Sequence, residues 1–151
     1  MDELILIINN ISRYGLQANV NIENKEQDLE KHLVYLYAKY FEIKDTIDSI
    51  DYPSYQRPNS ANFRENISLN FPALGWYHHT INSHKILQEA DLVTGDAIDD
   101  LADIILELLE VQWRYEHNSL EDATWFFKFI FQAHIQQHLL DLLSFFKSKN
   151  G

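Results

Sequence analysis

The chain has 151 residues, of which 46% are hydrophobic, and this is enough apolar material for one domain with its own core. It contains no cysteine, which excludes disulfides, thiolate zinc sites and cysteine nucleophiles and is typical of the reducing cytoplasm. The net charge of −11 predicts repulsion from nucleic acid, and no apolar run approaches the roughly 20 residues of a membrane helix. We therefore expect a single cytoplasmic domain over residues 1–151, with neither a nucleic-acid nor a membrane partner.

Apolar residues recur at helical spacing through the first third of the chain. A helix over residues 1–13, ending near Gly15, is predicted by the spacing of Leu4, Ile7, Ile8 and Ile11. A second helix is predicted to begin at Asn24, which forms a capping-box-like pair with Gln27, and to continue to Ile50. Its apolar seam alternates steps of four and three residues through Leu29, Leu33, Leu36, Tyr40, Ile43, Ile47 and Ile50. The seam indicates either one helix of an intramolecular bundle, which we favour, or a coiled-coil dimer.

Prolines interrupt the middle of the chain. Residues 51–58, DYPSYQRP, are expected to connect two elements because proline breaks a helix. A short helix is then predicted to begin at Asn59 or Ser60 and to end before Pro72, with apolar residues at Phe63, Ile67 and Phe71. The stretch over residues 71–95 has no clear period, and we expect no element there beyond a further short helix.

The last third of the chain predicts two long helices. Residues 94–96 supply the start of a helix over residues 97–117, whose Asp99, Asp103 and Glu107 are expected to face solvent. After a turn, Ser119 and Asp122 form a variant capping box for a last helix that reaches about Lys147. Helices joined by so short a turn are expected to lie antiparallel. The predicted fold is therefore all-α, a single-domain bundle of about five helices built on a long C-terminal antiparallel helical hairpin.

Two histidines lie four residues apart in the last helix, within WFFKFIFQAHIQQHLLDLLSFF, residues 125–146. Residues at this spacing share a helical face, so His134 and His138 could bind one metal ion if Asp100 or Asp103 supplied a third ligand. The apolar residues around them favour a different interpretation, a buried polar network in which Asp100 hydrogen-bonds a histidine. A histidine oriented by a carboxylate could also act as a general base. We expect the structural role, without a metal or other cofactor.

Four aromatic residues fall in the two irregular segments, where helix packing does not require them: Tyr52, Tyr55, Trp76 and Tyr77. Tyrosine and tryptophan are common anchors at peptide-binding surfaces, although their position beneath the loops favours a packing role in which these four close the open end of the bundle. Our first hypothesis is a non-catalytic interaction or adaptor protein that binds a protein or peptide partner through these residues. The alternative is a metal-dependent or acid–base enzyme that uses Asp100, His134 and His138.

Two blocks of the sequence carry a family resemblance. Residues 62–77, NFRENISLNFPALGWY, combine a short helix with a phenylalanine-proline pair and an aromatic residue. Residues 95–143 combine an Asp-Asp-Leu-Ala-Asp run, a tryptophan after the turn and the two histidines. In these features the chain resembles a bacterial family described as domain of unknown function 5063, over somewhat under half of its length. The resemblance implies a helical bacterial protein but no activity, and the positions that match the pattern are Asp99, Asp100, Asp103, His134 and His138.

Overall fold

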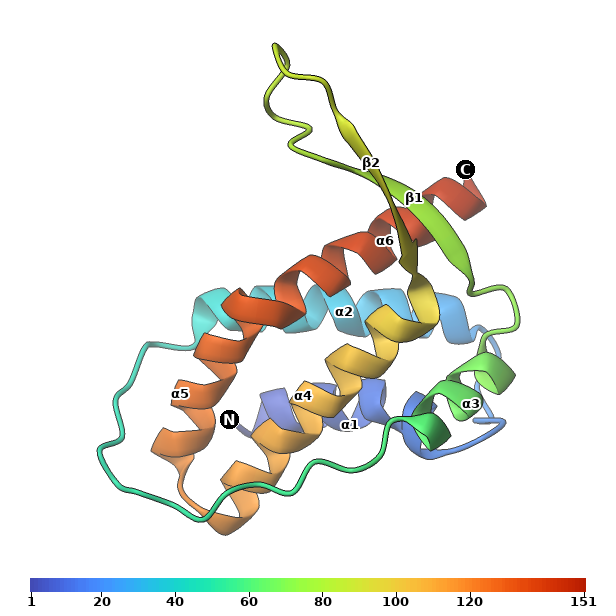
Figure 1. Ribbon diagram of the computed structural model, residues 1–151. Coiled ribbons are helices and arrows are strands. Elements are labelled where there is room, and N and C mark those ends of the chain that lie inside the picture. Colours follow the sequence, from blue (N-terminus) through green and yellow to red (C-terminus); the bar gives the residue numbers. More distant parts are fainter.

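The computed structural model describes residues 1–151 as a helical body from which one β-hairpin projects (Figure 1). The elements in chain order are α1 (Asp2–Leu16), α2 (Lys25–Glu42), α3 (Ala61–Asn70), β1 (Trp76–Ile81), β2 (Asp91–Asp96), α4 (Ala97–His117), α5 (Leu120–Ile130), the π-helical η1 (Phe131–Ile135) and α6 (Gln136–Asn150). Because α5, η1 and α6 follow without a break, the chain forms five helices, as predicted. No helix combines the length and the apolar character that a membrane span requires.

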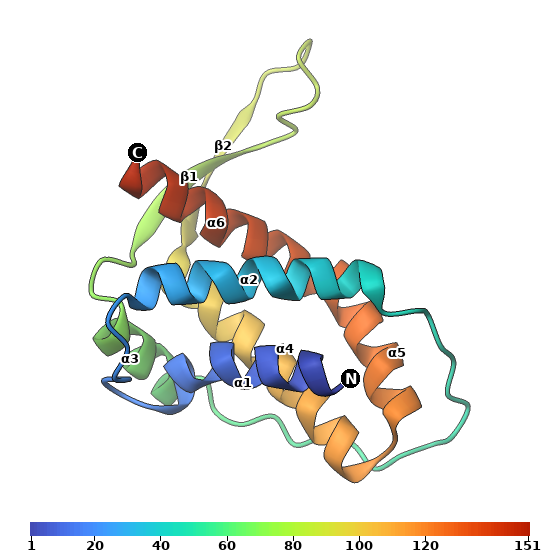
Figure 2. The same cartoon turned by 180° about the vertical axis from the view of Figure 1, so that it is seen from behind.

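Helix α4 is the centre of the core. It packs against α1, α3, α5 and α6, while α1 and α2 lie side by side on one face of the molecule (Figure 2). The inward face of α4 is fully buried at Leu101, Ile104, Ile105 and Leu108. Gly15 lies in the last turn of α1 and does not cap it. Here α1 approaches α4 so closely that a Cβ atom added to Gly15 would lie 2.9 Å from Cδ1 of Ile105. The predicted first helix is therefore confirmed and extends slightly further.

Helix α2 begins as predicted, with the Asn24 side chain accepting a hydrogen bond from the backbone of Gln27, but it ends at Glu42 instead of Ile50. Beyond this point Ile47 is 88% exposed, so no neighbouring element covers the continued seam. The Asp48 side chain instead accepts the backbone N–H of Ile50, which competes with helical pairing. The apolar period thus continues without a neighbour to cover it and with local hydrogen bonding by Asp48, so the predicted helix was too long.

The free carbonyl groups at the end of α2 accept hydrogen bonds from a side chain of α5. The Lys128 ammonium group in α5 donates to the carbonyl oxygens of Tyr40 at 2.9 Å and of Ile43 at 3.1 Å. A positive charge at this end also favours the helix dipole. The same ammonium group lies 4.1 Å from the centre of the Tyr40 ring. This capping fixes the end of α2 against α5.

The all-α prediction is wrong for the irregular stretch before α4, which forms an antiparallel β-hairpin rather than a short helix. Its strands pair Trp76 with Asp96 at the base and Ile81 with Asp91 toward the tip. Aromatic and β-branched residues in WYHHTI are typical of strands, and Asn82 adopts a positive φ of 58° at the start of the loop. Helix α4 begins at the base of the hairpin, where Asp96 ends β2 and caps the helix by accepting from the backbone N–H of Ile98.

The chain direction of α4 is opposite to that of the α5–η1–α6 segment, and a series of contacts joins the two along their length. Arg114 near its end contacts Asp122 at the start of α5, Glu107 contacts His134 in η1, and Asp100 near its start contacts His138 in α6. The last helix is not straight, however, and its direction changes between α5 and α6 (Figure 1). The π-helical segment at this bend contains His134.

One ion-pair cluster joins α1 to α2 and predicts an acid-dependent stability. The Asp28 carboxylate accepts from Tyr14 at 2.7 Å and from Arg13 at 2.5 Å. Burial acts to raise the pKa of Asp28, but the hydrogen bonds from Tyr14 and Arg13 outweigh it and lower the pKa. The resulting stabilisation is present above the unfolded-state pKa of about 3.9 and is lost as the pH falls through the lower folded-state pKa.

We therefore expect Asp28→Asn to flatten the acid side of the stability profile. Urea denaturation between about pH 6 and pH 3 should show the free energy of unfolding falling less steeply in Asp28→Asn than in the unsubstituted protein. Asp51→Asn, at an exposed position, is the control and should keep the original slope. Equal slopes for all three proteins would show that the cluster does not contribute.

Candidate metal centre

The two histidines and their acidic partners meet between α4 and the η1–α6 segment. Successive turns of α4 bring Asp100, Asp103 and Glu107 to the side that faces α6, and His134 and His138 approach them from the other helix. The π-helical segment holds His134 and ends shortly before His138. Such wide turns inside α-helices are rare and often occur at functional sites.

His138 is held on one side by a buried hydrogen-bonded chain. Its Nδ1 atom lies 2.7 Å from Oδ1 of Asp100, and the hydroxyl group of Tyr77 donates to Oδ2 of Asp100 at 2.5 Å. The Asp100 side chain is only 8% exposed. The hydrogen bond to Asp100 raises the pKa of His138 against the opposing effect of burial. Burial, followed by the hydrogen bond to Asp100, raises the pKa of Tyr77, so this hydroxyl group remains a donor.

His134 has a similar arrangement with a different acid. Its Nδ1 atom lies 3.3 Å from Oε1 of Glu107, whose side chain is only 7% exposed. The same carboxylate accepts a hydrogen bond from Arg57, which comes from the loop between α2 and α3. The prediction that Glu107 faces solvent is therefore wrong. Burial of this carboxylate is tolerated because a guanidinium group and an imidazole both contact it.

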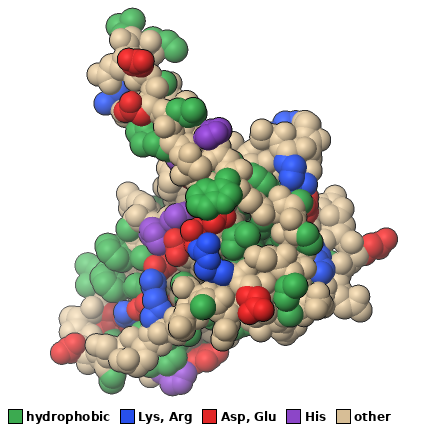
Figure 3. Space-filling model, turned by 45° about the vertical axis from the view of Figure 1, so that its right-hand side comes forward, with side chains coloured by type: hydrophobic (Ala, Val, Ile, Leu, Met, Phe, Trp, Pro, Cys, Tyr) green, Lys and Arg blue, Asp and Glu red, His purple; other side chains and the backbone are tan.

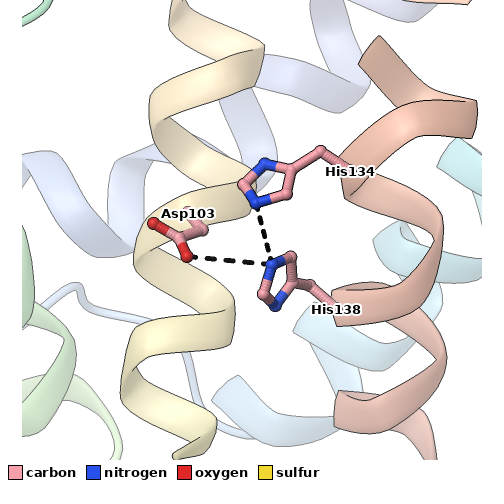
Figure 4. A group of neighbouring side chains, drawn as sticks. All are labelled: Asp103, His134 and His138. Carbon is pink, nitrogen blue, oxygen red and sulfur yellow. Dashed lines mark hydrogen bonds and ion pairs between the residues drawn. The ribbon is translucent and has the colours of Figure 1, made fainter.

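The remaining nitrogen atoms of the two imidazoles point toward one another (Figure 4). Nε2 of His138 lies 3.1 Å from Nε2 of His134 and 3.7 Å from Oδ2 of Asp103. The three ligand atoms of Asp103, His134 and His138 lie within 4.8 Å of one another. Asp103 accepts no hydrogen bond from any other group in the protein, in contrast to Asp100 and Glu107.

The protonation of the two rings decides what joins them. The Asp100 carboxylate only accepts hydrogen bonds, so Nδ1 of His138 carries a proton and Nε2 of the neutral ring presents a lone pair. Nδ1 of His134 lies at ion-pair distance from Glu107 without a hydrogen bond to it. Nε2 of His134 therefore either donates to Nε2 of His138 or presents a second lone pair to a shared cation. In the second state two nitrogen lone pairs face one position, with a carboxylate near the other nitrogen of each ring.

The donor set and its spacing fit a divalent transition metal. Nitrogen ligands about 2.0 to 2.1 Å from a tetrahedral ion lie about 3.3 Å apart, which is close to the separation of the two Nε2 atoms. Two imidazoles and a carboxylate, without thiolate, suit Zn²⁺, Mn²⁺, Fe²⁺ or Co²⁺. Asp100, which the sequence suggested as a ligand, orients His138 from behind instead, and Asp103 occupies the ligand position.

The site lies at the protein surface. The side chains of Asp103 and His134 are each 40% exposed. Histidine, acidic and basic side chains gather on this face, below the projecting hairpin (Figure 3). A neighbouring cavity of about 420 Å³ lies between the hairpin and α6, on the side where Tyr77 and His79 face Asp141 and Phe145. His79 contacts Asp141 at 3.2 Å and does not join the centre.

The four aromatic residues suggested for partner binding do not form one surface. Tyr52 donates to Asp48, and Tyr55 packs 5.4 Å from the Trp113 ring at the far end of α4. Tyr77 points inward to Asp100, so among the four only Trp76, at 74%, is strongly exposed. Tyr52 and Tyr55, in the loop between α2 and α3, therefore do not share a surface with Trp76 and Tyr77 of the hairpin.

Gly95 leaves room for the Tyr77 ring because it has no side chain, and its substitution is expected to destabilise the protein. It pairs with Tyr77 across the hairpin, and a Cβ atom on Gly95 would overlap the aromatic ring and its hydroxyl group. Because the ring is held by Asp100, it cannot move aside without losing that bond. We expect Gly95→Ala to reduce the free energy of unfolding by about 1 to 3 kcal/mol. Gly75→Ala, which would meet no atom within 4 Å, is the control and should be neutral by thermal denaturation.

The two histidines and both candidate aspartates were predicted from the sequence, whereas Glu107, Tyr77 and Arg57 were not predicted as parts of the centre. A signal existed for Glu107, since its spacing from Asp103 equals that of the two histidines on the antiparallel partner. No local signal marks Arg57 or Tyr77, because each reaches the centre from a segment far away in sequence.

No family model, no curated protein and no solved structure matches the chain. The resemblance to the bacterial family therefore remains a prediction from the two blocks of sequence. The proposal for the function rests on the geometry of the centre.

Proposed function

We propose that this protein binds a divalent transition metal through Asp103, His134 and His138 and uses it for hydrolytic acid–base chemistry. The observation that supports the proposal is the pair of Nε2 atoms facing each other at 3.1 Å with a buried carboxylate behind each ring. Carboxylate partners of this kind orient metal-binding histidines and increase their basicity.

The number of protein ligands favours a reactive centre over a closed structural one. Three ligands leave at least one coordination position for water, and a bound divalent ion lowers the pKa of that water toward about 7. Asp103 and His134 are partly exposed, so a substrate can reach this position from solvent. Asp100 and Glu107 hold the rings in place, and Tyr77 and Arg57 in turn hold these two acids.

Metal titration of the stripped protein, purified without an affinity tag, tests the proposal. We expect Zn²⁺, Mn²⁺ or Co²⁺ to bind at one equivalent by calorimetry and to raise the melting temperature. At a free metal concentration of 100 times Kd the stabilisation should be about 2.7 kcal/mol. Co²⁺ should also give the visible absorption of a site with nitrogen and oxygen ligands. Absence of stoichiometric binding by all three ions would contradict the proposal.

A second function, binding of a protein or peptide partner, is supported by the projecting hairpin. Its tip carries Ile86 and Leu87, which are 90% and 98% exposed, and Trp76 is exposed at its base. Apolar side chains held away from the body of a protein are typical of interaction sites. We propose this role for the hairpin alone, since the tyrosines of the preceding loop are occupied within the molecule.

Site-specific crosslinking tests the second function. A photoreactive residue at position 87 should capture a defined partner in cells, whereas one at Leu120, which is 49% exposed on the helical body, should not. The same crosslink should disappear when Ile86 is changed to Ser. Identical products from both positions would indicate random collision and contradict a role for the hairpin.

A further inference from the structure

Three carboxylates follow one another at steps of four residues along one side of α4, and only the middle one lacks an arginine partner. Asp99 pairs with Arg64, and Glu107 pairs with Arg57. Asp103 lies between them, about 6 Å from each along the helix axis, and its nearest ionisable partner is His138. The candidate metal position is therefore flanked along the helix by two guanidinium groups.

The two arginines differ in how much of their hydrogen-bonding capacity is used. Arg64 contacts Asp96 with one terminal nitrogen and Asp99 with the other. Arg57 contacts only Glu107, through Nη2, and its Nε and Nη1 groups have no partner in the protein. The Arg57 side chain is also 47% exposed. Arg57 is thus anchored at one nitrogen while it presents its other donors to solvent near the centre.

We propose that the bound metal and Arg57 together bind an oxyanion with at least two terminal oxygens, a phosphate group or a carboxylate, as the reactive part of the substrate. This inference rests on the proposed metal-dependent function. One oxygen of the anion would bind the ion held by Asp103, His134 and His138, and a second would accept a hydrogen bond from the free donors of Arg57. Arg57 is tied to this centre through Glu107, whose Oε1 atom contacts both the guanidinium group and Nδ1 of His134.

The local charge makes this binding depend on the metal. Six carboxylates and two guanidinium groups lie around the centre and leave a formal charge of −4, which a divalent ion would reduce to −2. The charged residues are Arg57, Arg64, Asp96, Asp99, Asp100, Asp103, Glu107 and Asp141. Without the ion, an approaching oxyanion meets net repulsion. With the ion, it meets a direct ligand position and the free donors of one arginine.

Relaxation measurements on Mn²⁺-loaded protein test the inference with two simple probes. Inorganic phosphate is followed by phosphorus NMR and acetate by carbon NMR, since paramagnetic Mn²⁺ broadens the signal of an anion in its coordination shell. We expect at least one of the two to bind to the loaded protein and neither to bind to the stripped protein. The probe that binds identifies the oxyanion class. Failure of both anions to bind would overturn the inference, while one equivalent of bound Mn²⁺ would leave the proposed function intact.

Two arginine variants then separate a specific contact from general attraction. Arg57→Gln should weaken binding of the anion by about 10- to 100-fold, the loss expected for a charge-assisted hydrogen bond. Arg64→Gln removes the same charge from the same face but should change the affinity by less than about 3-fold, because both terminal nitrogens of Arg64 are already engaged. Arg57→Lys keeps the pairing charge for Glu107 and should give an intermediate affinity. Equal effects of Arg57→Gln and Arg64→Gln, with Mn²⁺ still bound, would overturn the role of Arg57.

Discussion

His138→Ala should reduce the affinity for Zn²⁺ or Co²⁺ by more than about 100-fold, because it removes a direct ligand and not only a group that supports one. His138 contacts both other parts of the centre, with Nε2 near His134 and Asp103 and with Nδ1 on Asp100. Its loss leaves two ligands, which is too few to hold a divalent ion with useful affinity. Calorimetric titration of the stripped variant measures this change directly.

Two control variants sharpen this prediction. Asp100→Asn keeps the shape of the side chain that orients His138 and should cost about 10- to 100-fold in metal affinity, which is the usual effect of a supporting group. His84→Ala removes an exposed histidine on the hairpin loop and should leave the affinity unchanged. Unchanged metal affinity in His138→Ala would show that the metal, where it binds, is held elsewhere in the molecule.

Asn70→Ala is expected to be the most destabilising single substitution among those considered outside the apolar core. The Asn70 side chain accepts from the backbone N–H of Val20 at 2.8 Å, and its amide nitrogen shares two hydrogens among the carbonyl oxygens of Tyr14, Gln17 and Asn66 at 3.0, 2.7 and 3.0 Å. It is only 4% exposed, so water cannot replace these partners. Leaving several buried backbone groups unpaired should reduce the free energy of unfolding by about 3 kcal/mol or more.

Thermal and urea denaturation measure this loss. At roughly 2 to 4 °C per kcal/mol for a protein of this size, the melting temperature should fall by about 6 to 12 °C. Asn66→Ala, one turn earlier in α3, removes a single hydrogen bond to the carbonyl of Gly15 and should cost only about 1 kcal/mol. Equal losses in the two variants would mean that the joint between α1, the following loop and α3 does not depend on Asn70.

The features that local chemistry specifies were predictable from the sequence. The starts of α2, α4 and α5 follow from Asn24, Asp96 and Ser119, each of which accepts a hydrogen bond from the backbone of its helix. The antiparallel pairing of the last two helices follows from the short turn between them. His134 and His138 were identifiable because their spacing alone places them on one face.

The features that depend on distant segments could not be predicted in this way. Burial of Glu107 requires Arg57, which lies 50 residues away in sequence, so the spacing of the acids on α4 indicated a solvated face. The end of α2 at Glu42 depends on the absence of a neighbour over Ile47 and on Lys128 from another helix. The β-hairpin lacks the alternation of a half-buried sheet because most of it projects into solvent.

The π-helical segment has a consequence for how this centre could be gained or lost over evolution. A segment of this type contains one residue more than the α-helix it replaces, and a single-residue deletion within Phe131–Ile135 would turn all of α6 by about 100° relative to α5. His138 would then leave the face that meets Asp100. Among descendants of a common ancestor, we expect those that retain the histidine pair to retain the inserted residue as well, and those with a regular last helix to have lost the metal site.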